Sequence, residues 1–306
     1  MEFESKMKLR GLVFLLAVGL LNPLCAQARV RTHVPSSPAA ANGTDTGAAD
    51  VDPGRLRLRS SSLMVLDQSK SKVLFARNTE TVRPIASITK LMTAMVVLDA
   101  HLRMDEALNI TEADIDHLKA SHSRLPVGTQ LTRREFLRLA LMASENRAAS
   151  SLARNYPGGF TAFVAAMNRK AQGLQMAHSH FVDSTGLSES NVSTAHDLTR
   201  MVSAAYGYAP IREFTTTSSH TISTRRGRAP ILYRNSNRLV QASNRRWQID
   251  VSKTGYTSEA GHCLVMHTKI GHQPVIFVLL NSWGKLTPVG DSDRIRQWLE
   301  AHPARI

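Results

Sequence analysis

The chain has 306 residues, 42% of them hydrophobic and 20% charged, which suffices for one large domain or two modest ones with an ample core. Its net charge of +14 favours an anionic partner, such as nucleic acid, anionic lipid or an acidic polymer. Basic clusters occur at 225–228 and 245–246, but no base-reading motif accompanies them and only 6% of residues are aromatic. These features argue against nucleic-acid binding and favour a polyanionic surface outside the cytoplasm.

Residues 1–28 have the pattern of a secretory signal peptide. Lys6, Lys8 and Arg10 form a basic start. The apolar run Gly11 to Leu21 that follows is too short to span a bilayer comfortably. Small residues flank Gln27 in the triplet that ends at Ala28, which predicts cleavage after Ala28. We therefore expect an exported, periplasmic protein, with an uncleaved anchor as the alternative.

Residues 29–57 are rich in Ala, Pro, Ser, Gly, Thr and Asp, which predicts a flexible linker before a folded domain at 58–306. Only Cys263 remains after cleavage, so no intramolecular disulfide can form, and its apolar stretch predicts a buried small hydrophobe. The 12 histidines are scattered without metal-ligand spacing. Neither a metal site nor a cofactor is predicted.

The domain is expected to begin with a hairpin and a buried helix. Short β-type runs at Ser62–Asp67 and Lys72–Ala76 flank a polar turn, which indicates a hairpin. The segment Ser87–Ala100 is apolar around most of a helical circumference. A helix that central can hold a reactive side chain rigidly.

The block at about 101–207 is interpreted as an inserted, all-helical subdomain. Thr132 and Glu135 form a capping-box pattern that opens a helix. A second helix is predicted over Gly159–Ala171, ended by Gly173, and a third begins at Thr194.

After Phe214 the sequence changes to β-branched and alternating residues. The predicted strands, with a hairpin turn at 271–272 between the last two, are Thr215–Ser223, Arg228–Tyr233, Trp247–Lys253, Gly261–Lys269 and Gln273–Asn281. A closing helix is predicted over Asp291–His302. We expect an α+β fold in which the early hairpin and late strands form one antiparallel sheet, with the first and last helices packed on it.

A serine and a lysine three residues apart begin the first helix. Side chains at i and i+3 share a helix face, so the Lys90 amine can reach the Ser87 hydroxyl. Serine becomes a good nucleophile only when a nearby base takes its proton. The helix N-terminus favours an unprotonated amine and stabilises negative charge near Ser87. Because Ser-x-x-Lys also occurs by chance, its meaning depends on partners elsewhere in the chain.

Two further short motifs follow. Ser144-x-Asn146 interrupts an apolar helix face, where the alternative is a simple helix end or bend. Lys253-Thr254-Gly255 lies on a predicted strand, where the alternative is a strand end with its turn. In this order the three motifs resemble the catalytic set of the serine penicillin-recognising enzymes.

The resemblance extends over about residues 60 to 300. Segments 83–94, 144–149, 181–187 and 253–257 are similar to the low-molecular-mass penicillin-binding proteins, the D-alanyl-D-alanine carboxypeptidases and endopeptidases. This resemblance implies a β-lactamase/transpeptidase-like fold, peptidoglycan peptide stems as substrate and β-lactam antibiotics as covalent inhibitors.

Acyl transfer from a D-Ala peptide needs a nucleophile, a base, a proton path and an oxyanion hole. We assign Ser87 as the nucleophile that becomes an acyl-ester. Lys90 is its general base, with a pKa that burial and Lys253 can both depress. By the resemblance, Ser144 relays a proton to the leaving nitrogen, and Asn146 holds Lys90 or the substrate amide.

The remaining assignments concern substrate binding. Lys253 adds positive potential, and Thr254 offers its hydroxyl to the substrate carboxylate. Gly255 is expected to let the substrate backbone lie close to the strand, where a Cβ would intrude. The backbone N–H groups of Ser87 and Tyr256 are the predicted oxyanion hole.

The choice among activities also follows from the resemblance. No segment resembles the loop that carries the extra glutamate of class A β-lactamases, so that activity ranks third. About 50 residues follow Lys253, too few for a further β-domain, and Trp298 and Leu299 suit a core, so no stable membrane anchor is expected. We therefore expect a D,D-endopeptidase, with a D,D-carboxypeptidase as the alternative. A non-catalytic wall-binding protein is a less favoured hypothesis.

Overall fold

The structure is a computed structural model that describes residues 56–223, 229–241 and 246–306. The predicted signal peptide, nearly all of the predicted linker, and the basic cluster at 225–228 lie outside the described residues. All the elements described below belong to one compact unit of the chain.

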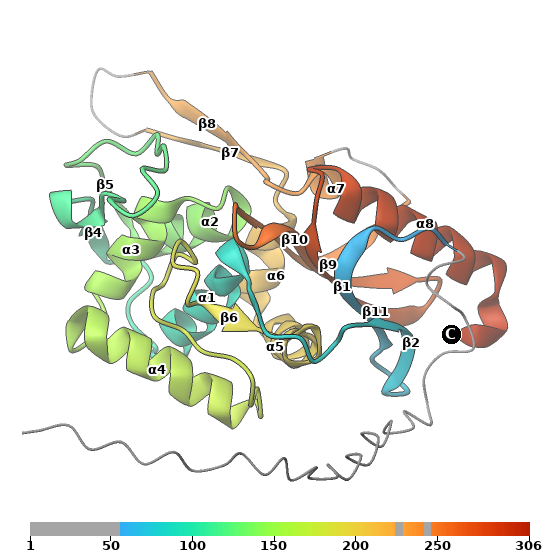
Figure 1. Ribbon diagram of the computed structural model, residues 1–306. Coiled ribbons are helices and arrows are strands. Elements are labelled where there is room, and N and C mark those ends of the chain that lie inside the picture. The colour runs from blue at the N-terminus through green and yellow to red at the C-terminus, as the bar shows by residue number, and fades with distance from the viewer. Residues whose placement is uncertain (1–55, 224–228, 242–245) are drawn as a thin grey trace, which may run out of the picture. The chain divides into compact units, whose positions relative to one another are not determined.

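A five-stranded antiparallel sheet forms the centre of the fold (Figure 1). The strand order is β2-β1-β11-β10-β9, with β1 at Ser60–Asp67, β2 at Lys72–Arg77, β9 at Gln248–Thr257, β10 at Gly261–Ile270 and β11 at Gln273–Ser282. The predicted hairpins at 68–71 and 271–272 are confirmed by the antiparallel pairing of β1 with β2 and of β10 with β11. Strand β9 is the last in the order, which leaves it beside the functional site.

Both faces of the sheet are buried because successive side chains point in opposite directions. On one face, Leu63 and Val65 pack with Ile295 and Leu299 of the closing helix α8 (Thr287–Ala301). On the other face, residues such as Met64 belong to the core shared with the helices. The sheet therefore separates two hydrophobic clusters, which explains the nearly continuous apolar sequence of its inner strands.

The helical block covers the second face. Its helices, with a 3₁₀ turn η1 (Ala86–Ile88) before the first, are α1 at Thr89–Asp99, α2 at Arg133–Met142, α3 at Asn146–Arg154, α4 at Gly159–Gly173, α5 at Ala195–Tyr206 and α6 at Ala209–Thr216. Helix α1 is buried along nearly its whole length and contacts α2, α3, α4 and α5. The first helix therefore lies inside the helical block, and α5, whose apolar side chains lie on one face, is the helix that lies along the sheet.

Three short strand pairs modify the predicted architecture. Strand β4 (Ala107–Asn109) pairs with β5 (Gln130–Thr132), so the block at 101–207 is not helical throughout. Leu108 is buried between exposed neighbours, which is the alternation of a strand. Strand β3 (Arg83–Pro84) similarly pairs with β6 (Val192–Ser193).

The two strands predicted first after Phe214 do not join the main sheet. Strand β7 (Ser219–Ile222) pairs only with β8 (Ile231–Arg234) among the described strands. The threonines at 215–216 instead end helix α6, because tertiary packing on α2 and β9 overrides their β-propensity. Three further short turns of helix are α7 (Arg238–Gln241), η2 (Glu112–Asp114) and η3 (Pro303–Arg305).

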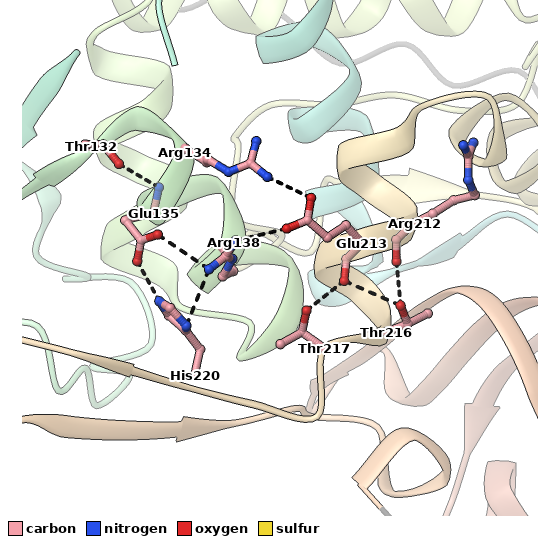
Figure 2. A network of polar contacts seen from close by, with 9 residues as sticks. All are labelled: Thr132, Arg134, Glu135, Arg138, Arg212, Glu213, Thr216, Thr217 and His220. Carbon is pink, nitrogen blue, oxygen red and sulfur yellow. Dashed lines mark hydrogen bonds and ion pairs between the residues drawn. The ribbon is translucent and has the colours of Figure 1, made fainter. Parts of the chain in front are cut away.

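Charged side chains fasten this hairpin and α6 to α2 (Figure 2). Arg134 and Arg138 both pair with Glu213 of α6, at 2.7 and 3.0 Å. His220 of β7 has Nε2 2.7 Å from a carboxylate oxygen of Glu135, and Arg138 approaches its Nδ1 at 3.4 Å. Because Arg138 can only donate, His220 accepts at Nδ1 and donates from Nε2 to Glu135. The network fixes the direction of α2, whose far end leads into the functional site.

The predicted N-cap at Thr132 is confirmed, and Thr194, where the sequence predicted a helix start, is also an N-cap. Thr132 accepts a hydrogen bond from the backbone N–H of Glu135, and Thr194 does the same for Asp197. The Glu135 carboxylate contacts His220 and Arg138, so only the threonine half of the predicted capping box forms.

Candidate active site

The start of α1 brings a buried amine to a serine hydroxyl. Ser87 lies in the 3₁₀ turn before α1, and Lys90 is the second residue of the helix. Lys90 is 0% exposed, and its Nζ lies 2.8 Å from Ser87 Oγ. Nζ also lies 2.7 Å from Asn146 Oδ1 and 2.6 Å from the carbonyl oxygen of Thr185. The amine therefore has three oxygen neighbours, of which one is the predicted nucleophile.

These contacts determine what a neutral amine can do. Asn146 Oδ1 and the Thr185 carbonyl can only accept, so they take the two N–H groups of an unprotonated Lys90. The remaining lone pair then faces the Ser87 hydroxyl, the one neighbour of the three that can donate a proton. The site is thus built for proton transfer from Ser87 to Lys90.

Burial allows Lys90 to be unprotonated near neutral pH. It lowers the pKa of Lys90 to about 7, against opposition from the carboxylates of Asp183 and Glu145. We expected Lys253 to help lower the pKa of Lys90. Instead, the charge of Lys90 helps to lower the pKa of Lys253. Burial is therefore the cause of the shift at Lys90, as the sequence predicted in part.

A second buried lysine lies beside Ser144. Ser144 joins α2 to α3 in the left-handed region, with φ of 61°. Lys253, on β9, has its Nζ 3.0 Å from Ser144 Oγ and 2.8 Å from the carbonyl oxygen of Thr254. Burial, and after it the charge of Lys90, holds the pKa of Lys253 well below its usual range. Lys253 therefore gives up its proton more readily than an exposed lysine does.

Asn146 lies between the two walls of the site. Its Nδ2 donates to Ser121 Oγ at 2.9 Å, which directs Oδ1 toward Lys90. Ser121 belongs to the segment before α2, for which the sequence suggested no role. On β9, Thr254 Oγ1 donates to Ser236 Oγ at 2.7 Å, a second partner that sequence reasoning did not identify.

Gly255 allows β9 to lie against the nucleophile. A Cβ there would lie 3.0 Å from the Ile85 carbonyl oxygen and 3.1 Å from the Ser87 nitrogen. The missing side chain therefore makes room for the protein's own backbone, whereas we expected it to make room for substrate. Tyr256 follows, 61% exposed, with its ring stacked on His262 at 4.2 Å between centroids.

The loop after α4 supports the nucleophile from the opposite side. The Asp183 carboxylate accepts five hydrogen bonds from the loop, from the backbone N–H of Thr185, Gly186 and Ser188 and the side chains of Thr185 and Asn191, at 2.6–3.0 Å. This arrangement presents the Thr185 carbonyl to Lys90. Gly186 has φ of 80°, and a Cβ there would lie 1.9 Å from the Ala86 carbonyl oxygen. The Asp-x-Thr-Gly pattern at 183–186 was the available sequence signal for this turn.

These residues surround one cleft of about 850 Å³. Ser87, Ser144, Asn146, Thr254, Gly255 and Tyr256 line it, and Lys90 and Lys253 are buried in its wall through their contacts with Ser87 and Ser144. The structure thus brings together all eight residues that the sequence singled out. Cys263 is buried, as predicted, at one side of the cleft. In the described part of the chain, no cluster of three His, Cys, Asp or Glu side chains is arranged to hold a metal ion.

Comparison with known proteins identifies the family. A family profile described as D-alanyl-D-alanine carboxypeptidase matches residues 48–284. The chain belongs to the D-alanyl-D-alanine carboxypeptidase family. Members of this family are serine-type D-Ala-D-Ala peptidases, so the chain is a hydrolase of that class.

Relatives of this family member include two proteins that are named as endopeptidases. The D-alanyl-D-alanine endopeptidase of Pseudomonas aeruginosa is 50% identical over 248 residues, which cover 81% of this chain and 79% of the relative. The D-alanyl-D-alanine endopeptidase of Escherichia coli K12 is 42% identical over 293 residues, 96% of this chain and 89% of the relative. The predicted penicillin-binding-protein resemblance is thereby confirmed.

The fold is that of solved D,D-transpeptidases. The crystal structure of the Streptomyces K15 DD-transpeptidase superposes with a TM-score of 0.73 at 27% identity, over 80% of this chain and 98% of that one. The predicted α+β class, with an antiparallel sheet flanked by helices, is therefore confirmed. Within 56–223, 229–241 and 246–306, none of the helices has the length and apolarity needed to cross a membrane.

Proposed function

We propose that this family member is a D,D-endopeptidase that hydrolyses D-alanyl cross-links of peptidoglycan through an acyl-enzyme on Ser87. The observation that carries the proposal is the contact of the buried Lys90 amine with Ser87 Oγ at 2.8 Å, with the other two oxygens able only to accept. The peptidoglycan peptide stem is the substrate, and the described domain is the catalytic domain.

Acylation begins with proton transfer from Ser87 to Lys90. As the proton leaves, Ser87 Oγ attacks the D-Ala carbonyl carbon, and the carbonyl oxygen takes up the negative charge. We assign the backbone N–H groups of Ser87 and Tyr256 as the donors that stabilise that oxyanion, each contributing about 3 kcal/mol. The approach of β9 at Gly255 to the Ser87 nitrogen supports this pairing of donors.

Collapse of the tetrahedral intermediate breaks the carbon–nitrogen bond. Ser144 passes a proton to the leaving nitrogen, and Lys253, 3.0 Å from Ser144 Oγ, resupplies it. Before the second half-reaction, the proton that Lys90 took from Ser87 passes to Lys253, so that both lysines regain their starting protonation states. Lys90 then takes a proton from the water molecule that attacks the ester and gives it to Ser87 Oγ as the ester bond breaks. Thr254, on the exposed side of the cleft, binds the carboxylate of the leaving residue.

The relatives favour cleavage of cross-links over trimming of stem ends. The two endopeptidases are 50% and 42% identical to this chain. The carboxypeptidases of Bacillus subtilis and Streptomyces K15 are 28% and 31% identical. D,D-carboxypeptidase activity on uncross-linked stems remains the second candidate.

Digestion of defined muropeptides tests the proposal. The purified protein is expected to convert cross-linked muropeptide dimers to monomers, and Ser87→Ala is expected to abolish the conversion. Release of free D-Ala from pentapeptide monomers, with dimers left intact, would favour the carboxypeptidase instead. Dimers that persist alongside unchanged monomers would refute both activities.

β-Lactams are proposed to acylate the same serine. Penicillin-binding protein D2 of Listeria monocytogenes, solved in a cefotaxime-bound form, superposes with a TM-score of 0.68 at 28% identity. Mass spectrometry after penicillin treatment should find the adduct on Ser87 and lose it in Ser87→Ala. No adduct on the native protein would contradict the assigned nucleophile.

We also propose that the protein acts in the periplasm after cleavage behind Ala28. The basic start and short apolar run of the sequence support export, and peptidoglycan lies outside the cytoplasm. N-terminal sequencing of the exported protein would test the cleavage position.

A further inference from the structure

An ion pair that the proposed mechanism does not use joins two walls of the cleft. Lys119 Nζ lies 2.5 Å from an oxygen of Glu259, which is on the turn between β9 and β10. Lys119 also lines the cleft that contains Ser87, with its side chain 31% exposed. The hydrogen bond from Lys119 lowers the pKa of Glu259 to about 2, so the carboxylate is ionised at ordinary pH. The Lys119 ammonium is thus held at the edge of the cleft by the Glu259 carboxylate.

The segment that carries Lys119 is fixed relative to the reacting groups. Asp116 accepts hydrogen bonds from the backbone N–H groups of Leu118, Lys119 and Ser121, at 2.8–3.0 Å. Two residues beyond Lys119, Ser121 Oγ accepts from Asn146, which contacts Lys90. The position of Lys119 is therefore tied to the position of the base.

The ion pair lies on the side where the acyl part of the substrate must run. In the proposed mechanism, Ser144, Lys253 and Thr254 serve the leaving group. The acyl portion must then extend the other way along β9, past Gly255 toward Ser258. That end of the cleft is lined by Ser258 and Lys119, and Glu259 follows directly.

We propose that Lys119 is a substrate-specificity residue whose ammonium binds a free carboxylate of the peptide stem, on the acyl side of the scissile bond. Glu259 occupies the ammonium until the stem carboxylate replaces it. This inference rests on the proposed function. Exchange of one carboxylate for another keeps the charge balance, so the ion pair costs little to open, as is usual for exposed pairs. The net charge of +14 also suits an anionic stem.

Paired synthetic substrates test the role of Lys119. Two cross-linked peptide dimers are compared that differ only in a free carboxylate or a carboxamide on the stem that forms the acyl-enzyme. The native protein is expected to show about a fivefold lower KM for the carboxylate peptide, and Lys119→Met should remove the difference. Glu259→Gln should lower the KM for the carboxylate peptide several-fold and change that for the amide peptide by less than about twofold.

Arg103→Met is the matched control, because it removes a cation from an exposed ion pair with Asp105 that does not line the cleft. It should leave the ratio of the two KM values unchanged. A ratio that Lys119→Met does not change, or a Glu259→Gln variant that behaves like Lys119→Met, overturns the proposal and makes the pair a structural bridge. Native protein that forms a Ser87 penicillin adduct and cleaves both peptides equally overturns the specificity role alone. If neither peptide is cleaved, with or without an adduct, the proposed function is overturned as well.

Discussion

The start of α1 and the edge strand β9 each contribute a buried lysine to the same cleft, but the two lysines have different surroundings. Lys90 has three oxygen neighbours and lies within the influence of two carboxylates. Lys253 has two oxygen neighbours, and the nearest influence on its charge is the cation of Lys90. Burial lowers the pKa of both lysines, but carboxylates oppose it at Lys90 while a cation reinforces it at Lys253.

The difference assigns distinct capacities to the two amines. Lys90, with a pKa of about 7, can hold or release a proton near neutral pH. Lys253 loses its proton more readily while Lys90 is charged, because the charges of two buried ammonium groups repel each other. In the proposed mechanism, Lys90 takes the Ser87 proton, and its new charge then promotes release of a proton from Lys253 toward Ser144. The two lysines would thus serve as base and acid of one transfer.

Loss of the amine at the start of α1 should have the largest effect. Lys90→Met removes the base and is expected to reduce the rate of Ser87 acylation by about 10²- to 10⁴-fold. In the native protein, the rate should rise with pH through about 7, because the unprotonated amine is the active form. Stopped-flow acylation with a chromogenic β-lactam measures both.

Lys170→Met is the matched control, since Lys170 pairs with Asp99 outside the cleft. It should leave the acylation rate and its pH profile as they are. A Lys90→Met protein that acylates within threefold of the native rate would show that another group is the base.

Gly186 and Gly255 both pack against the segment that carries Ser87, but their substitution should impair different properties. Gly186→Ala places a Cβ 1.9 Å from the Ala86 carbonyl oxygen at φ of 80°, so a loss of about 3 kcal/mol or more in the free energy of unfolding is expected. Gly255→Ala meets its neighbours at 3.0–3.1 Å, which a small shift of β9 can relieve. Acylation should then fall about tenfold with little loss of stability.

Thermal unfolding and acylation rates of both variants check this order. Gly173→Ala, where a Cβ meets nothing within 4 Å, provides the comparison for a tolerated substitution. Equal stability of the Gly186 and Gly255 variants would contradict the stated packing.

The smallest effect is expected from substitution of Glu145, whose carboxylate raises the pKa of Lys90 and so opposes the effect of burial. Glu145→Gln removes a negative charge that favours protonated Lys90, so the pKa of Lys90 should fall. The acidic limb of the acylation profile should move to lower pH by roughly half a unit. A movement to higher pH would mean that the altered hydrogen bond to Ser123, now 2.6 Å, matters more than the charge.

Local signals predicted much of the fold. The hairpins at 68–71 and 271–272, the cap at Thr132 and the helix start at Thr194 were recognised because turn and cap chemistry depends on neighbouring residues. The hairpin β7–β8 was placed in the wrong sheet, because strand partners are set by packing between distant segments. Strands β4 and β5 are too short to be distinguished by pattern.

The site followed the same division. The sequence identified the motif residues, and the family resemblance grouped them into one site: Ser87, Lys90, Ser144, Asn146 and 253–256. The roles of their partners Ser121, Asp183, Thr185 and Ser236 were not predicted, although segment 181–187 was noted for its resemblance. These residues contribute common polar side chains or a carbonyl oxygen, and their hydrogen bonds of 2.6–2.9 Å form only in the folded chain. The close packing of Gly255 against the protein's own backbone was also not predicted.

The sequence by itself determined which groups can react: a serine and a lysine on one helical turn, and a second lysine on a strand. Tertiary structure alone decided the protonation chemistry. The pKa of Lys90 depends on its complete burial and on the charges of Asp183 and Glu145, which lie 93 and 55 positions away along the chain. Desolvation and Coulomb energy depend on distance in space, so only the folded arrangement of α1, β9 and the loop at 183–188 could set them.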